Sequence, residues 1–563
     1  MNLLFFADYG SVGDGFLGFF KGFFGYPAIL IGIFALVGSL IQRKKSSEVL
    51  ISTLKTIIGF LIISGGAGVL STTLGNLTSV IKNGFKLGSE SGMDFIIPSN
   101  EAAMAWMTAN IPDIMTSASI ILILAMICNI ILAKLSNLKY IYLTGHVAFY
   151  TSLALSIAMW MAGLKPMQNI QDTVIVLLSG SLFLGLYMVL SPAASAKLAA
   201  KIAGNENLAL GHTGGFGVAI SGIMGIGLLK LSKKQVLVST ENIRIPEKLK
   251  VLADNIVSLS LTMIVIYMTI MMIALGISGL DAFANKWDAD GNATSWLIGN
   301  DSISKNVGNA IVYAFVQSLT FVAGIQIIIF GVKMFLGELI PAFSGIANKL
   351  IKGSKAAVEV QAFWPAAPNG VIFGFLASFF GGLVTFGILL GVHFSLRNGD
   401  SNLARYFPVV LPELFPHLFI GGTAAVFANY KGGIRGALIA PFIVGFIWAW
   451  FPVIYKDLGM VPSELTDQLL PNGEKAVMNS ATFAEVDHII AVIPFLLIKL
   501  NKWLWLGISV ALFLAPIIIS VVKNAFDKNK TNKTDVKTLK EEQIKDISLN
   551  TKDSKQVGEV NGV

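Results

Sequence analysis

Residues 143–150 read Leu-Thr-Gly-His-Val-Ala-Phe-Tyr and lie inside a long apolar run. An imidazole placed in hydrocarbon needs a hydrogen-bond partner or a water-lined cavity, and the glycine beside it lets the backbone bend. Packing against lipid alone does not explain this combination. The stretch therefore predicts a ligand site in a membrane-embedded chain.

The whole chain has the composition of a membrane protein. Of its 563 residues, 54% are hydrophobic and only 13% are charged, whereas soluble proteins carry about 25% charged residues. Apolar segments of about 18 residues or more recur along the chain, and each can cross a hydrocarbon core as a helix. These features exclude a soluble multidomain protein and predict an all-α polytopic membrane protein.

The charges and the single cysteine narrow the classes of function. The net charge of +8 comes from 41 Lys and Arg against 33 Asp and Glu, but the basic residues lie between apolar segments and in the C-terminal tail. This placement indicates membrane topology, and we expect no nucleic-acid partner. Cys128 is the only cysteine, so no disulfide framework and no cysteine-based metal cluster is expected.

The chain also lacks the sequence motifs of common catalytic sites. No Gly-Lys dipeptide occurs, which excludes a P-loop, and the patterns H-E-x-x-H, G-x-S-x-G and Cys-x-x-Cys do not occur either. We therefore expect no catalytic residue, no metal and no cofactor in this chain. Any chemical step linked to its function would take place on another protein.

The apolar segments predict about eleven transmembrane helices and re-entrant hairpins. Arg43-Lys44-Lys45 follow the first span at once, so the positive-inside rule places the N-terminus outside, and the alternation of basic loops places the C-terminus in the cytoplasm. The glycine-dense stretch 211–217 leads into a segment too short for an ordinary span, which favours a re-entrant hairpin. The predicted spans are residues 26–42, 49–70, 117–135, 140–163, 173–190, 256–277, 309–330, 371–393, 406–427, 436–454 and 503–521.

A weak internal similarity predicts two inverted repeats. Residues 57–81 resemble residues 327–351, and most later spans recur at an offset of roughly 260 to 270 residues, as in many transporters. The predicted organisation is an interfacial segment 1–25, a first transmembrane repeat 26–230 with a re-entrant hairpin, a cytoplasmic connector 231–253, a second repeat 254–456, an external loop with the last helix 457–523, and a disordered cytoplasmic tail 524–563.

Polar side chains within the apolar segments are the candidate functional residues. His146 either hydrogen-bonds a hydroxylated ligand or caps a neighbouring helix, and its glycine neighbour favours the ligand. His212 lies in the glycine-dense stretch, where free backbone amides suit an anionic or polyhydroxyl group. Glu359 precedes two prolines, and such an interrupted backbone again favours a site.

Other polar residues fit structural roles at least as well. Lys55 and Lys333 lie near the ends of predicted spans, and such lysines more often extend to the aqueous interface than bind a ligand. Glu413 either lines a cavity or pairs with a helix terminus. His393 and His488 look peripheral.

Several motifs in order resemble one known family. They are Lys-Thr-Ile-Ile-Gly-Phe at 55–60, Leu-Thr-Gly-His at 143–146, Asp-Asn-Ile-Val-Ser at 254–258, Ala-Pro-Asn at 367–369 and Phe-Ala-Asn at 427–429. Together they resemble the ascorbate-specific membrane subunit, enzyme IIC, of the bacterial phosphoenolpyruvate-dependent phosphotransferase system. The resemblance runs from about the first span to the last.

This resemblance implies an architecture and a mechanism of uptake. It implies an eleven-span homodimer in the bacterial plasma membrane, in which a core domain carries the substrate past a dimerising domain. It also implies membrane lipid as the surroundings and a cytoplasmic IIB partner, itself served by IIA, that phosphorylates the sugar on release. Transport of this kind needs no ion gradient.

The resemblance also implies a set of substrate-binding positions. They are Asn100, Glu101, His146, Val147, Ala148, Phe149, Tyr150, His212, Thr213 and Glu359. The family has glutamine at the positions of Tyr150 and Thr213, and aspartate at that of Glu359. Losing two carboxamides removes donors and acceptors that orient a polyhydroxyl ligand. The resemblance therefore implies L-ascorbate as the substrate, and the three departures extend this expectation to a related sugar acid.

A second interpretation of the same sequence is an ion-coupled secondary transporter of similar elevator design. It requires a coupling carboxylate within the membrane, for which Glu359 and Glu413 are the candidates. Uptake of the unmodified solute on an imposed ion gradient would distinguish this transporter from a phosphotransferase permease.

Overall fold

The computed structural model describes residues 27–84, 95–232, 237–243, 254–287, 293–397, 406–413, 416–461, 481–483 and 485–527. The predicted interfacial segment, most of the connector, and the tail beyond residue 527 lie outside these ranges. Within them the chain is mostly helical, as predicted for an all-α membrane protein.

Eight of the described helices are long and apolar enough to cross a membrane. They run over Ser46–Leu70, Pro112–Leu135, Ile170–Ala203, Leu259–Phe283, Val307–Met334, Pro368–His393, His417–Asp457 and Lys502–Asp527. A further apolar helix, Gly215–Leu231, is shorter and follows the glycine-dense stretch, where a re-entrant hairpin was predicted. The polytopic class is thus confirmed, and the number of spans stays a prediction.

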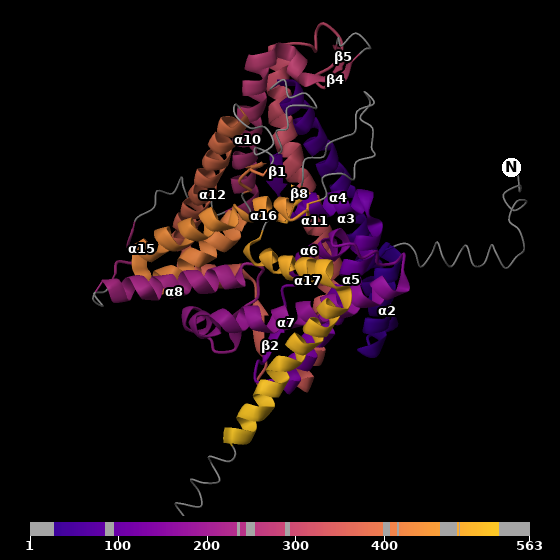
Figure 1. Ribbon diagram of the computed structural model, residues 1–563, viewed down its shortest axis with the longest axis vertical. Helices are drawn as coiled ribbons and strands as arrows, with labels where there is room; N and C mark the ends of the chain where they lie inside the picture. Colours follow the sequence, from indigo (N-terminus) through magenta and orange to yellow (C-terminus); the bar gives the residue numbers. More distant parts are fainter. Residues whose placement is uncertain are drawn as a thin grey trace, which may run out of the picture.

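One group of helices is built around two unusually long ones (Figure 1). Helices α3 (Ser46–Gly84) and α11 (Val307–Leu350) pack along each other, and α2 (Pro27–Ile41) and α10 (Asn255–Ser278) pack against them. These two long helices contain the two sequence stretches that resemble each other. The antiparallel hairpin of β4 (Ala284–Trp287) and β5 (Ala293–Trp296) follows α10 and caps this end of the molecule.

A second group consists of α8 (Gly215–Leu231), α12 (Pro368–Arg397) and α15 (Gly422–Trp448). Helices α8 and α12 each pack closely on α15, and the three lie near one another in Figure 1. Helix α15 bends at Gly433, where φ is 55° and ψ is −154°. A side chain strongly disfavours this conformation, so glycine is needed at the bend.

A third group contains α5 (Pro112–Leu135), α6 (Gly145–Met161) and α7 (Ile170–Ala203). The C-terminal helix Lys502–Asp527 is attached to it near the start of α7, where the Lys502 Nζ atom lies 2.9 Å from Asp172 Oδ1. The ring of Trp505 packs edge-on against Phe183 with 5.3 Å between ring centroids. The remaining regular helices are α4 (Asn100–Asn110), α16 (Phe451–Asp457) and α17 (Val492–Leu500).

Two short parallel sheets connect the two halves of the chain. In one, β6 (Lys355–Val358) lies between β2 (Tyr140–Tyr142) and β3 (Leu208–Leu210). In the other, β1 (Phe95–Pro98) lies between β7 (Val409–Val410) and β8 (Ala481–Thr482). In each sheet, the central strand comes from the opposite half of the chain to the two outer strands. The halves are therefore interlocked.

These strands correct two predicted segments. The span predicted over 140–163 begins as strand β2, and its helix starts only at Gly145. The span predicted over 406–427 likewise begins with β7. Its helical part starts at His417 and continues through the bend of α15 into the span predicted over 436–454.

Close contact between α8 and α15 depends on Gly225, and this gives a prediction for stability. A Cβ atom there would lie 2.8 Å from the Cα atom of Ala428, whereas nothing lies within 4 Å of a Cβ built on Gly227 in the same helix. We expect Gly225→Ala to lower the stability by about 1–3 kcal/mol, because the backbones must separate. Gly227→Ala should be neutral or stabilising by up to about 1 kcal/mol. Thermal unfolding in detergent measures both, and equal effects of the two variants would contradict the packing argument.

Candidate solute-binding site

The first sheet brings together three candidate residues that lie far apart in the sequence. Strands β2, β6 and β3 are parallel and neighbouring, so their carboxyl ends lie at the same edge. His146, Glu359 and His212 each follow one of these strands within a few residues. The polar residues are therefore placed by the sheet.

The second sheet likewise brings together polar residues that lie far apart in the sequence. Asn100 follows the central strand β1, and Glu413 and Glu485 follow the outer strands β7 and β8. Residues after both sheets line one cavity, of about 110 Å³. At about 30 Å³ per water in the liquid, this volume corresponds to roughly four water molecules, which a small polyhydroxyl solute could replace.

Fifteen side chains line this cavity, and most of its polar groups come from the two sheet edges and from α11. The lining residues are Asn100, His146, Val147, Tyr150, His212, Gln326, Ile329, Val332, Lys333, Glu359, Gln361, Glu413, Pro416, Phe419 and Glu485.

His146 and Glu359 form the shortest polar contact at the cavity. The Nε2 atom of His146 lies 2.7 Å from Glu359 Oε1, with the two side chains 26% and 36% exposed. Burial raises the pKa of the Glu359 carboxyl, but the hydrogen bond and charge interaction with His146 outweigh burial and hold this pKa below its ordinary value. The carboxylate thus accepts hydrogen bonds, and it fixes the orientation of the imidazole.

His212 lies deeper and is held by aromatic packing. Its ring stacks on Phe419 with 6.3 Å between ring centroids, and Trp364 packs on the same Phe419 ring. Burial lowers the pKa of His212 to about 3, so the imidazole is neutral. Its Nδ1 atom lies 3.7 Å from Glu485 Oε2 and lacks a hydrogen-bond partner among the described residues. A buried polar atom of this kind marks a position for a ligand group.

Asn100 lies on the opposite side of Glu485. Its Nδ2 atom donates to Glu485 Oε1 over 3.1 Å, so Glu485 lies between the carboxamide and His212. Glu485 could not be predicted from the sequence, because it follows a mixed polar stretch that resembles an external loop.

The other predicted site residues are only partly at the cavity. Val147 and Tyr150 line it, whereas Ala148 and Phe149 face the hydrophobic core. Thr213 is fully buried beside the site but does not line the cavity. Glu101 begins α4, and its side chain is outside the described part of the structure. Substrate contact by each of these residues stays a prediction.

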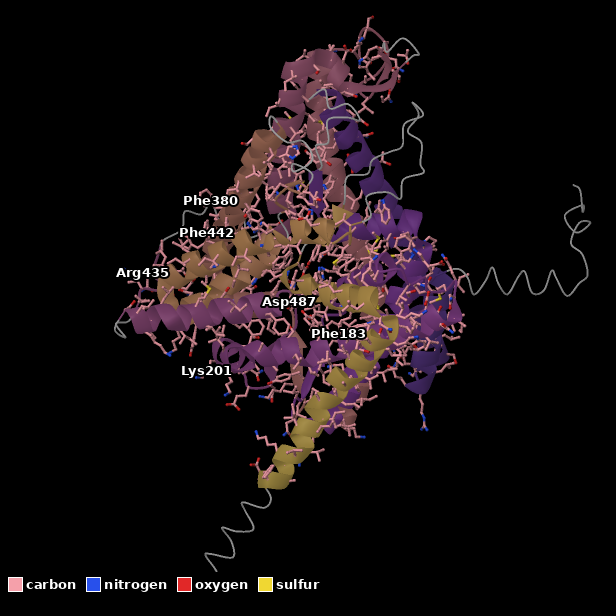
Figure 2. The ribbon with its side chains drawn as sticks, in the orientation of Figure 1. Phe183, Lys201, Phe380, Arg435, Phe442 and Asp487 are labelled. Carbon is pink, nitrogen blue, oxygen red and sulfur yellow. The ribbon has the colours of Figure 1, made fainter. Side chains whose placement is uncertain are left out.

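Behind His212, a buried carboxylate anchors the backbone of the site. The Oδ2 atom of Asp487 accepts a hydrogen bond from the Tyr187 hydroxyl over 2.8 Å and from the Phe216 amide over 3.2 Å. The same hydroxyl lies 3.0 Å from the carbonyl oxygen of His212, and the Asp487 amide donates to the Thr213 carbonyl over 2.9 Å. Figure 2 shows Asp487 in the middle of the helices.

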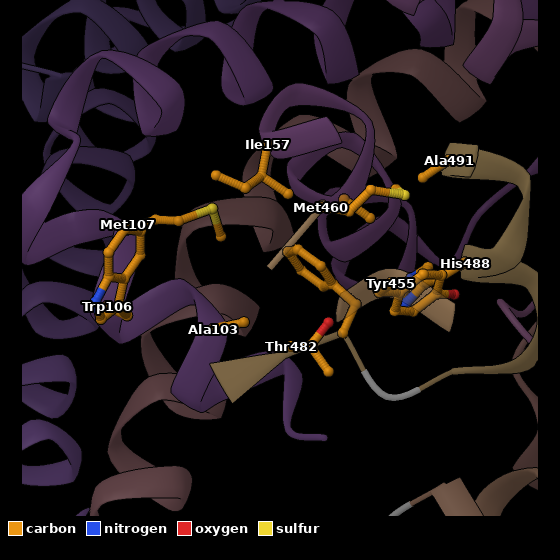
Figure 3. Close-up of a pocket in the computed structure, with 11 residues that line it drawn as sticks. Ala103, Trp106, Met107, Ile157, Tyr455, Met460, Thr482, His488 and Ala491 are labelled. Carbon is orange, nitrogen blue, oxygen red and sulfur yellow. The ribbon is translucent and has the colours of Figure 1, made fainter. Parts of the chain in front are cut away.

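The prediction that two histidines are peripheral was wrong. Asp487, in the segment predicted to hold an external loop, is only 1% exposed. His488, expected to be peripheral, is also 1% exposed and packs edge-on against Phe483. Figure 3 shows His488 with Tyr455 in the lining of a second, mostly apolar cavity of about 30 Å³. His393, the other histidine expected to be peripheral, is likewise buried.

The side chains at these cavities suit binding better than catalysis. Across the described ranges, no three His, Cys, Asp or Glu side chains are placed to hold a metal ion. Cys128 is half-buried in α5, against Gly185 of α7. The solute cavity offers imidazole, carboxamide and carboxylate groups, which together donate to and accept from hydroxyl groups.

Comparisons with known proteins show which chains this one is similar to. The family model described as "PTS system sugar-specific permease component" (EIIC-GAT), PTS being the phosphotransferase system, matches residues 22–461. The "Ascorbate-specific PTS system EIIC component" of Mycoplasma pneumoniae (strain ATCC 29342 / M129 / Subtype 1) is 27% identical over 444 residues, which cover 76% of this chain and 64% of the relative. The chain thus spans less than two thirds of that relative's length.

These matches confirm the resemblance seen in the sequence motifs. The family match begins before the first described helix and ends just after α16. It includes the residues that follow both sheets, except for β8 and Glu485, which lie beyond its end. Because the match covers well over half of the residues, this chain belongs to the sugar-specific permease components of the phosphotransferase system.

Proposed function

We propose that this protein takes up a sugar acid, L-ascorbate or a close relative, and that a separate cytoplasmic IIB protein phosphorylates the solute as it is released. The observation that carries the proposal is the convergence of His146, Glu359, His212 and Asn100 on one cavity. These groups offer both donors and acceptors to a solute rich in hydroxyl groups. The name of the Mycoplasma relative supports ascorbate as the substrate.

Phosphorylation would make the uptake one-way. A phosphate group adds about 1.5 to 2 negative charges at neutral pH, and a cavity that already contains several carboxylates would bind this product poorly. The phosphoryl group would come from the IIB partner, which IIA in turn supplies. The permease itself would then need only to bind and move the solute.

The arrangement of the strands supports the proposed pair of inverted repeats. Strand β6 begins 260 residues after β1, β7 begins 269 after β2, and β8 begins 273 after β3. Each corresponding pair also holds the same place in its sheet, central or outer. We propose that the two halves are structural repeats that exchange their central strands, within an eleven-span homodimer whose N-terminus is outside.

Uptake into membrane vesicles tests the proposed function. With phosphoenolpyruvate and the soluble phosphotransferase proteins inside, labelled L-ascorbate should accumulate as its phosphate, and omitting IIB should stop accumulation. An imposed proton or sodium gradient alone should give no uptake. If the unmodified solute accumulates on such a gradient without phosphoenolpyruvate, the protein is instead an ion-coupled transporter.

A further inference from the structure

A lysine on α11, Lys333, lines the solute cavity together with the residues that follow the two sheets. Gln326, Ile329 and Lys333 line the cavity, and their spacing of three and four residues places them on one face of α11. The positive charge of Lys333 also interacts with Glu359 across the cavity. The lysine thus belongs to the cavity wall.

Lys333 lies near the end of the apolar part of its helix. The helix continues to Leu350, but the stretch that is apolar enough to cross a membrane runs from Val307 to Met334, and the lysine is exposed. A lysine at this position can extend either to the aqueous interface or into a water-lined cavity. Its place among the lining residues favours the cavity.

Lys333 also has a special place in the charge balance of the cavity. The described lining includes three carboxyl side chains, Glu359, Glu413 and Glu485, and Lys333 alone among the lining residues carries a fixed positive charge. His212 is neutral, as burial requires. Without this ammonium, the only positive charge left in the described lining would be that of His146, which is already paired with Glu359.

We propose that Lys333 is the residue that makes the site selective for an anionic solute, because its ammonium binds the negatively charged group of a sugar acid. This inference rests on the proposed function and adds the charge of the substrate to it. The hydroxyl groups of the solute face the histidines and carboxylates of the sheet edges, and its anionic group faces α11.

A matched pair of ligands tests this role. L-Ascorbate is an anion at neutral pH, and L-galactono-1,4-lactone is a neutral compound with a similar ring and side chain. Their affinities are measured on the full-length protein in nanodiscs. We expect Lys333→Met to weaken ascorbate binding by about 10- to 100-fold, the range for a hydrogen bond to a charged group, and lactone binding by less than about 2-fold. Lys333→Arg should retain ascorbate binding, and Lys201→Met, an exposed lysine at the end of α7, should leave both affinities unchanged.

Ionic strength gives a second measurement that a purely structural role would not affect. Salt should weaken ascorbate binding to the wild type more than to Lys333→Met. The inference is overturned if Lys333→Met binds ascorbate as tightly as the wild type, or loses both ligands equally. If the wild type binds the lactone but not ascorbate, this result contradicts both the sugar-acid substrate and the role of Lys333. If it binds neither ligand, the proposed function itself fails.

Discussion

Replacing His146 with alanine should abolish high-affinity binding of the sugar acid while the protein still inserts into the membrane. The variant removes the imidazole that faces the cavity and leaves the Glu359 carboxylate without its partner 2.7 Å away. Loss of a hydrogen bond to a charged group costs about 1.5–3 kcal/mol, and the solute would lose its own contact with the ring in addition. We therefore expect the affinity to fall by about 100-fold or more.

Ser156→Ala is a suitable control for this experiment. Ser156 lies in the same helix and is fully buried, but its hydroxyl bonds only to the backbone of Ser152 within α6. The control should therefore bind ascorbate like the wild type. Ascorbate affinity is measured by equilibrium binding in nanodiscs, with gel filtration to verify the fold. Unchanged affinity in His146→Ala would remove His146 from the site.

The polar residues of the site could be predicted because they interrupt long apolar runs. His146 and His212 stand beside glycines in segments that lipid packing does not explain, and Glu359 precedes prolines. The strands that place these three residues could not be predicted. They are only three or four residues long, and a short apolar run carries too little periodicity to distinguish a strand from the end of a helix.

The site residues that could not be predicted lie in segments whose local composition is typical of another environment. Glu485 and Asp487 follow a mixed polar stretch typical of an external loop, but their surroundings are created by contacts with α4, α7 and α8, hundreds of residues away. Lys333 was assigned to the membrane surface because the apolar window ends before it, although the helix does not. Burial and helix length at these positions depend on tertiary packing.

Asp487 is where such a distant contact matters most for stability. The N-terminus of α8 has no local side-chain cap, since Gly214 occupies that position. Asp487 accepts the Phe216 amide in its place, from 271 residues further along the chain. Free N–H groups at a helix N-terminus are stabilised by a carboxylate. This one side chain therefore fixes both the start of α8 and, through Tyr187, the backbone of His212.

We expect Asp487→Ala to lower the free energy of unfolding by about 1–3 kcal/mol, because it leaves the buried Phe216 amide without its acceptor and leaves the Tyr187 hydroxyl with only the His212 carbonyl. Ascorbate affinity should fall as well, since the backbone that carries His212 is no longer fixed. Thermal unfolding followed by fluorescence-detected gel filtration, together with equilibrium binding, measures both effects. Glu206→Gln, which changes an exposed carboxylate in the turn after α7, is the matched control and should alter neither quantity.

Tyr187→Phe provides a milder variant if Asp487→Ala fails to accumulate in the membrane. It removes only the hydroxyl shared between Asp487 and the His212 carbonyl, so we expect a loss of about 1–2 kcal/mol. The Tyr187 hydroxyl and the Asp487 carboxylate are in direct contact. The loss of stability caused by Tyr187→Phe should therefore be much smaller in the Asp487→Asn variant than in the wild type. Additive losses in the double variant, or wild-type affinity in Asp487→Asn and Tyr187→Phe alike, would show that the buried carboxylate does not position His212.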